Sequence, residues 1–169
     1  MSKYSEKLLG YTLVELLVGL VIISILFGVG FAGFRDFSRR QSLESLSRKI
    51  KGDLFLAREN AVSGTKPLND FGSAQHEFCI SPNILFGYNF RVVSNSNYVL
   101  EAICSGGTVE VKNVNIPEEL SISIPPANPL FFQVLSKGTN LSSDLEIIIN
   151  QETTGKTKSM FITKTGEIK

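Results

Sequence analysis

The hydrophobic pattern changes twice along the chain, and each part predicts a different kind of element. Residues 16–34 read LLVGLVIISILFGVGFAGF and contain no charged side chain. Residues 35–64 place apolar side chains at steps of mostly three and four, and beyond Gly64 short segments alternate between apolar and polar positions. The pattern therefore predicts a helix that is apolar all round, then an amphipathic helix, then a series of β-strands.

The uncharged run is long enough to cross a membrane as a helix. A helix over residues 11–34 would measure roughly 36 Å at about 1.5 Å per residue, against about 30 Å for a hydrocarbon core. A single-span anchor, a secretory signal peptide and a buried helix of a soluble domain are the three interpretations. The run exceeds the usual signal-peptide core of about 7–15 residues. The positive-inside rule does not decide the orientation, because basic residues flank both ends: Lys3 and Lys7 before it, and Arg35, Arg39 and Arg40 after it.

Glu15 does not fit a plain anchor. A carboxylate within the first turns of a membrane helix is costly unless it has a partner. Two interpretations stay open. The carboxylate can lie at the headgroup level near a helix N-terminus, where the helix dipole favours it. Alternatively, its partner is a cation supplied by another chain.

The segment Gly10-Tyr11-Thr12-Leu13-Val14-Glu15, behind a short basic leader, resembles the class III signal of type IV pilins and pseudopilins. The resemblance implies that a prepilin peptidase cuts between Gly10 and Tyr11 and that Tyr11 is then N-methylated. It also implies that Glu15 pairs with the N-terminal amine of a neighbouring subunit during filament assembly. A buried ion pair costs less than a lone buried carboxylate, which agrees with this role. The chain departs from the family in having tyrosine rather than phenylalanine at position 11, and in lacking the mid-helix proline of many major pilins.

Residues 35–64 continue the helix with one apolar face. Gly64, followed by Thr65-Lys66-Pro67, supplies a stop signal. The basic residues between 35 and 40 fit contact with lipid headgroups better than a nucleic-acid site. The stripe expected to pack on a globular domain consists of Phe37, Leu43, Leu46, Ile50, Leu54, Ala57 and Ala61.

The pattern over the rest of the chain predicts short antiparallel strands. Residues 88–93 and 98–104 flank a polar turn at 94–97, which predicts a hairpin. Further strands are expected at 109–116, 120–124, 130–135, 145–149 and 159–163, in an antiparallel sandwich or a curved sheet. The segments LARENAV (56–62) and FITKTGEI (161–168) resemble the GspH/FimT family of minor pseudopilins and minor pilins.

These features predict an α+β fold of pilin-like type. A long N-terminal helix, with a membrane or filament half and an amphipathic half, would pack on a C-terminal antiparallel β domain. The expected segments are a leader peptide (1–10), a transmembrane or filament-core helix (11–34), its amphipathic continuation (35–64) and a globular β domain (65–169).

Composition excludes several kinds of site. The chain has one histidine and two cysteines, so it cannot build a multi-histidine or four-thiolate metal centre. Cys79 and Cys104 could form a disulfide closing a 26-residue loop, remain as buried thiols, or include a nucleophile; export favours the disulfide. His76 lies in a polar segment without a catalytic partner, and no catalytic constellation or cofactor motif is found. We therefore expect neither an enzyme nor a bound cofactor.

The expected function is that of a minor pilin or pseudopilin. Its partners would be other pilin or pseudopilin subunits, prepilin peptidase, the inner membrane and secreted cargo. The expected location is the bacterial inner membrane, crossed once with the C-terminal domain outside the cytoplasm, before assembly into a periplasmic or extracellular filament. A membrane-anchored β domain that never polymerises is one alternative. A competence-type pilin that binds DNA is the other; nucleic acid is not expected, because bases (17) and acids (16) nearly balance, and the remaining candidates are Lys156, Lys158, Lys164 and Lys169.

Overall fold

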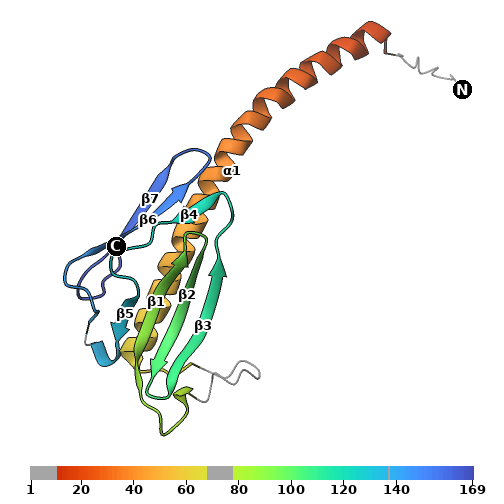
Figure 1. Cartoon of the computed structure of the whole chain (residues 1–169). Coiled ribbons are helices and arrows are strands. Elements are labelled where there is room, and N and C mark those ends of the chain that lie inside the picture. Colours follow the sequence, from red (N-terminus) through yellow and green to blue (C-terminus); the bar gives the residue numbers. More distant parts are fainter. Residues whose placement is uncertain (1–10, 68–77, 137) are drawn as a thin grey trace, which may run out of the picture. The chain divides into compact units, whose positions relative to one another are not determined.

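The structure is a computed structural model that describes residues 11–67, 78–136 and 138–169, and the chain divides into two compact units. The first unit is Met1–Arg40 and the second is Gln41–Lys169. A single α-helix, α1 (Leu13–Ser63), crosses the boundary between them. All of the β-strands belong to the second unit (Figure 1).

In the first unit, α1 starts immediately after a capping residue. The Thr12 Oγ1 accepts the backbone N–H of Glu15 at 3.3 Å, and the Thr12 carbonyl accepts the N–H of Leu16 at 3.2 Å. Further along, Arg40 and Asp36 form an exposed ion pair one helical turn apart, at 3.0 Å. Among the side chains that the structure describes, which leave out residues 29–33, no stretch of helix is both long and apolar enough to cross a membrane.

In the second unit, the amphipathic part of α1 supplies one wall of the core. The buried stripe begins at Leu43 and ends at Ala61. The helix ends at Gly64, whose φ of 65° lies in the left-handed region that glycine adopts without strain. There the N–H of Thr65 bonds to the Asn60 carbonyl at 3.0 Å, which closes the last turn.

Within the described residues, seven strands form two antiparallel sheets. The four-stranded sheet has the order β3-β2-β1-β5, and the three-stranded sheet has the order β4-β6-β7. A short 3₁₀ turn, η2 (Val134–Ser136), follows β5. The strands are β1 (Leu85–Ser94), β2 (Asn97–Cys104), β3 (Gly107–Asn115), β4 (Leu120–Ile122), β5 (Leu130–Gln133), β6 (Leu145–Gln151) and β7 (Thr157–Ile162).

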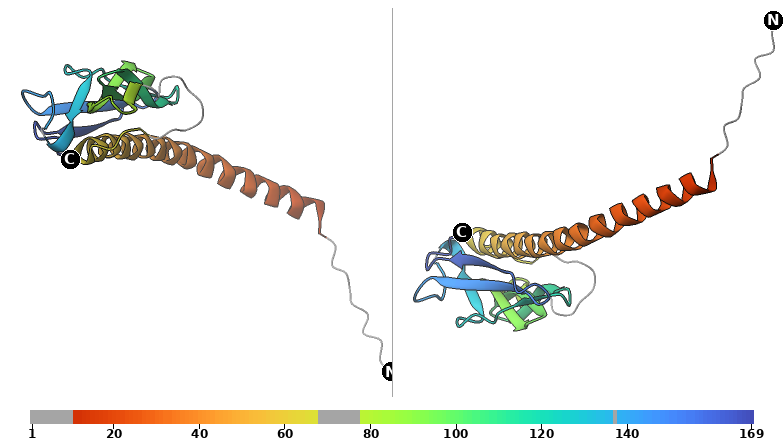
Figure 2. Two further views of the ribbon diagram at one scale, coloured as in Figure 1. Left: turned by 90° about the horizontal axis from the view of Figure 1, so that it is seen from below. Right: turned by 90° about the horizontal axis from the view of Figure 1, so that it is seen from above.

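Both sheets turn their apolar faces toward residues 41–63 of α1. Seen from below and from above, the strands of this unit lie on one side of the helical segment (Figure 2). The core between them is closely packed: the rings of Phe90 and Tyr98 stack at a tilt with centroids 5.1 Å apart. The largest fully buried aliphatic side chains come from the helix and from both sheets: Ile50, Leu54, Leu100, Leu130, Ile122, Ile147, Ile149 and Ile162.

The fold class expected from the sequence, one long N-terminal helix packed on a β domain in a pilin-like arrangement, is wrong. The helix has 51 residues, and the boundary at Arg40 divides it, so only residues 41–63 share a compact unit with the strands. The physical reason is that burial starts late. Phe37 was expected to open the packed stripe but is 63% exposed, whereas Leu43 is the first buried apolar residue of α1 among the described side chains. The fold is instead a helical unit followed by an α+β unit with two antiparallel sheets.

The individual strands were predicted more accurately. Each of the seven predicted segments overlaps a strand, and β1 and β2 form the expected hairpin, with residues 95–96 as its turn. The helix ends at Ser63, immediately before the stop signal expected at Gly64. The alternation of apolar and polar residues was sufficient to locate the strands, because each sheet has one buried face.

Candidate assembly surface and polar sites

The predicted processing site lies at the edge of the described chain. Gly10 and the leader, residues 1–10, are outside the described residues. Tyr11, the predicted N-methylation site, is 82% exposed and precedes the helix. Glu15 lies in the first turn of α1 with an exposed side chain.

Thr12 gives Glu15 a local role that the sequence interpretation missed. Thr12 is the N-cap residue and Glu15 stands at the third helical position, the spacing of a capping box. The pattern Thr-x-x-Glu ahead of an apolar run was present in the sequence and could have revealed it. The negative charge is also favoured there by the positive end of the helix dipole.

The start of α1 carries a continuous apolar surface. Its large apolar side chains occupy every side of the helix, so the segment has no polar face to turn toward water. An exposed surface of this kind fits an apolar environment, either lipid or the helices of other molecules. The side chains concerned, each at least half exposed, are Leu13, Val14, Leu16, Leu17, Val18, Leu20, Val21, Ile22, Ile23, Ile25, Leu26 and Phe27.

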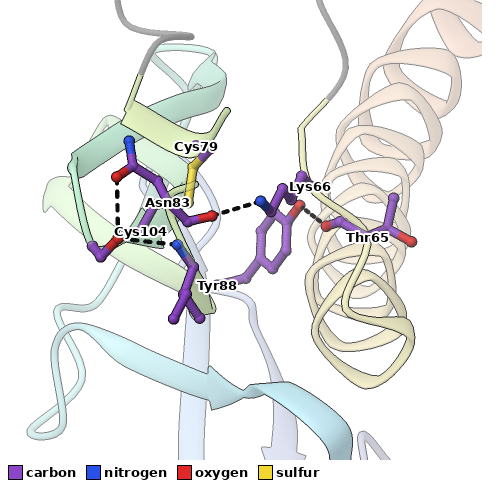
Figure 3. Close-up of a disulfide and its surroundings, with 8 residues drawn as sticks. Thr65, Lys66, Cys79, Asn83, Tyr88 and Cys104 are labelled. Atoms are coloured by element: carbon purple, nitrogen blue, oxygen red, sulfur yellow. Dashed lines mark hydrogen bonds between the residues drawn. A yellow bond between two sulfur atoms is a disulfide. The ribbon is translucent and has the colours of Figure 1, made fainter. Parts of the chain in front are cut away.

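Cys79 and Cys104 form a disulfide, with their Cα atoms 5.3 Å apart. Close to it, the residues that follow α1 are tied to the strands (Figure 3). The Lys66 Nζ donates to the Asn83 carbonyl at 2.6 Å, and the Tyr88 hydroxyl donates to the Thr65 carbonyl at 2.6 Å. The end of the helix is thereby fastened to the start of β1.

Tyr88 gives the second unit a predictable sensitivity to alkali. Burial raises the pKa of Tyr88 to about 12, from about 10 for a free phenol. The folded chain keeps this proton in a range where the unfolded chain loses it, so stability is full below pH 10 and falls as the pH rises toward 12. We expect a loss of about 1.4 kcal/mol at pH 11 from this residue.

The variant Tyr88→Phe isolates this effect. Phenylalanine cannot ionise, so the variant lacks this alkaline loss, and the missing hydrogen bond to Thr65 lowers its stability already at pH 8. Urea unfolding of both proteins at pH 8 and pH 11 should therefore show the smaller alkaline loss in the variant. Equal losses in the two proteins would contradict the assignment.

Asp53 is a buried carboxylate on the helix. It is 5% exposed, and it accepts hydrogen bonds from the Tyr98 hydroxyl at 2.7 Å and the Lys112 Nζ at 2.6 Å. Burial, and then the hydrogen bond and charge of Asp53, raise the pKa of Tyr98 well above its usual range. The group joins α1 to β2 and β3, so it links the helix to the four-stranded sheet.

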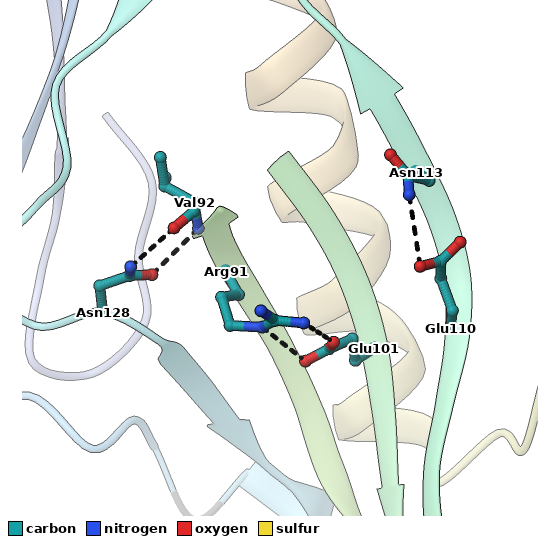
Figure 4. A network of polar contacts seen from close by, with 6 residues as sticks. All are labelled: Arg91, Val92, Glu101, Glu110, Asn113 and Asn128. Carbon is teal, nitrogen blue, oxygen red and sulfur yellow. Dashed lines mark hydrogen bonds and ion pairs between the residues drawn. The ribbon is translucent and has the colours of Figure 1, made fainter. Parts of the chain in front are cut away.

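The outer face of the four-stranded sheet carries a second polar group (Figure 4). The Arg91 guanidinium binds the Glu101 carboxylate in a bidentate manner, with Nε donating to Oε2 at 3.2 Å and Nη2 donating to Oε1. The hydrogen bond from Arg91 to Glu101 raises the pKa of the guanidinium. Nearby, Asn128 bridges the backbone N–H and carbonyl of Val92, which fixes the chain beside β1.

The four lysines proposed as a DNA-binding candidate do not stand free together. Lys158 on β7 forms an ion pair with Glu44 of α1, and this hydrogen bond, followed by that of Arg48, lowers the pKa of Glu44. Lys169 pairs with Glu167 at 3.6 Å. Lys164 is exposed, and Lys156 also has an interaction of its own. At least two of the four charges are therefore compensated within the chain.

Within the described part of the chain, no group of three or more His, Cys, Asp or Glu side chains could hold a metal ion. His76 lies outside the described residues. Comparisons with family models, with curated proteins and with solved structures find no match to this chain.

Proposed function

We propose that this chain is a minor pilin or pseudopilin, a structural subunit of a type IV pilus-like or type II secretion filament. The observation that carries the proposal is the apolar surface of α1 between Leu13 and Phe27, with the Glu15 carboxylate at its start. A soluble monomer gains nothing from such a surface, whereas a subunit that packs among other helices buries it. The resemblance of residues 10–15 to the class III signal also supports this proposal.

The proposed cycle assigns each part of the chain one task. Prepilin peptidase would cut after Gly10, and the new amine of Tyr11 would receive a methyl group. The apolar segment would hold the subunit in the bacterial inner membrane, with the second unit outside the cytoplasm, until assembly. The Glu15 carboxylate of one subunit would then pair with the amine of its neighbour. Support for the membrane step comes from the uncharged run over residues 16–34.

Glu15→Gln is the variant that separates assembly from capping. Glutamine can replace glutamate at the third position of a capping box, so the helix start is kept while the charge is removed. We expect the amount of protein in the membrane fraction to stay unchanged. Incorporation into sheared filaments should fall at least tenfold, a change worth about 1.4 kcal/mol. Both quantities are measured by immunoblot in cells that carry the native assembly machinery.

Thr12→Ala is the matched control, because it removes the cap and keeps the charge. It should cost about 1 kcal/mol of helix stability and leave incorporation largely intact. In all samples the N-terminal peptide should begin at N-methylated Tyr11 by mass spectrometry, so that lost assembly is not lost processing. Normal incorporation of Glu15→Gln would reduce the carboxylate to a capping group. Absence of the parent chain itself from the sheared filaments would instead make the protein a membrane-anchored β domain that does not polymerise.

A further inference from the structure

A small pocket lies where the end of α1 meets β5 and the C-terminal segment. All of its walls belong to the second unit. Two helical residues of the LARENAV segment, Arg58 and Ala61, contribute to it. We call it the Arg58 pocket; its other principal lining residues are Val62, Phe132, Gln133 and Thr165.

Arg58 is the only charged residue that lines the pocket, and its own chain compensates it poorly. Its side chain is 36% exposed, and among the described residues its one ion pair joins Nη1 to Glu59 Oε1 at 3.7 Å. Neighbouring residues on a helix point in different directions, so this contact is long and poorly aligned. The Glu59 side chain is 67% exposed and largely solvated. The guanidinium is thus left with donors available for another acceptor.

The other walls define the shape of the acceptor. Gln133 carries an amide group that can donate to an oxyanion. The Thr165 hydroxyl shares a hydrogen bond with the Thr163 hydroxyl at 2.8 Å, and it can donate to an oxyanion when the Thr163 hydroxyl is the donor of that bond. Phe132 and Val62 add apolar surface next to these donors. Planar guanidinium groups bind carboxylates through two parallel hydrogen bonds, and no acidic residue lines the pocket to compete.

An exposed leucine close in sequence to the pocket is the reason for considering a polypeptide ligand. Leu135 lies two positions after Gln133, with φ 57° and ψ 41°, a conformation that is unfavourable for leucine. Its side chain is 69% exposed. An exposed leucine two positions after a pocket-lining glutamine fits a partner segment in which an acidic residue and an apolar residue lie close together.

We propose that the Arg58 pocket binds the carboxylate of an acidic side chain on a partner polypeptide, with an apolar neighbour contacting Leu135. The identity of the partner, an adjacent filament subunit, rests on the proposed function. The binding itself does not, because it can be measured on the isolated chain without assembly. Failure of assembly and failure of the pocket are therefore distinguishable.

The test is an NMR titration of the full chain in neutral detergent at low salt. The probe is the blocked dipeptide N-acetyl-Glu-Leu-amide, observed through the Arg58 Nε–H signal. We expect saturable binding with a dissociation constant on the order of 1–10 mM. The matched uncharged probe, N-acetyl-Gln-Leu-amide, should bind at least tenfold more weakly.

Two arginine variants on the same helix provide the controls. Arg58→Gln should abolish the shifts seen at Gln133 and Thr165, while Arg48→Gln, on an exposed arginine with an ion pair of its own, should leave them unchanged. Thr165→Val tests the opposite wall without touching the helix and should weaken binding about threefold. Equal binding of the two dipeptides would overturn the carboxylate assignment. Inorganic phosphate binding as tightly as the Glu-Leu probe would overturn the polypeptide assignment. A shift at Arg58 no larger than at Arg48 would overturn the site.

Discussion

Asp53→Ala is expected to destabilise the second unit by about 3 kcal/mol, at the lower end of the range for breaking a buried ion pair. The substitution leaves the fully buried Tyr98 hydroxyl without its acceptor. An unsatisfied buried group of this kind costs about 1–3 kcal/mol, and the small cavity adds to it. Lys112 is 39% exposed and can turn its ammonium group to water, which limits the loss.

Urea unfolding of the full chain, followed by tyrosine fluorescence, measures this change, since the chain has no tryptophan. Glu59→Ala is the matched control, because the same helix loses an exposed carboxylate. Its free energy of unfolding should change by less than about 0.5 kcal/mol. If Asp53→Ala unfolded at the same urea concentration as the control, the buried network would carry no stability.

A second variant tests why Asp53 is there. Replacing the whole group by apolar residues, as in Asp53→Leu with Tyr98→Phe and Lys112→Met, removes every charge together with its partner. Such replacements are often neutral or stabilising in other proteins. We therefore expect the triple variant to be more stable than Asp53→Ala alone. The opposite order would mean that packing at this site, rather than the unpaired polar groups, dominates the loss.

Removing the disulfide is expected to have an effect of similar size. Cys79 and Cys104 are 25 positions apart, and closing a loop of that length stabilises the folded state by about 3.5 kcal/mol in the chain-entropy model. Both side chains are also buried, so alanine at both positions gives up some apolar contact. We expect Cys79→Ala with Cys104→Ala to lower the free energy of unfolding by about 3–5 kcal/mol.

Reduction provides the internal control for this prediction. A thiol reductant should lower the urea midpoint of the parent chain toward that of the double variant and leave the double variant unaffected. Ser105→Ala, next to Cys104, controls for disturbance of the nearby hydrogen bonds to Asn83 and Ile84. A parent chain whose midpoint is insensitive to reductant would show that the bond does not contribute.

The sequence predicted local structure well because local structure follows from periodicity. The stripe from Leu43 to Ala61 is buried as expected, and every predicted strand is present. Phe37 shows the limit of such reasoning. It continues the spacing of the stripe, yet it is 63% exposed, because periodicity identifies a face of a helix and not where that face stops having a partner.

The polar sites were harder to foresee, although two of them left a signal. Asp53 falls between Ile50 and Ala57 at helical spacing, so the apolar stripe itself placed a carboxylate on the buried face. Thr12 and Glu15 carried the capping-box spacing. In contrast, the Arg58 pocket depends on β5 and the C-terminal segment approaching the helix, and no local pattern encodes that juxtaposition.

The order of the strands has a consequence for how this unit folds during synthesis. The chain enters the four-stranded sheet with β1, β2 and β3, leaves it for β4, returns for β5, and leaves again for β6 and β7. Pairings such as Phe90 with Leu130 and Ile122 with Ile149 close long loops. The four-stranded sheet has all its strands once β5 has been made, whereas the three-stranded sheet still needs β6 and β7, and both sheets share one core with α1. Such non-local topologies fold on the order of milliseconds to seconds, so we expect one late, all-or-none folding step after β7 has been made.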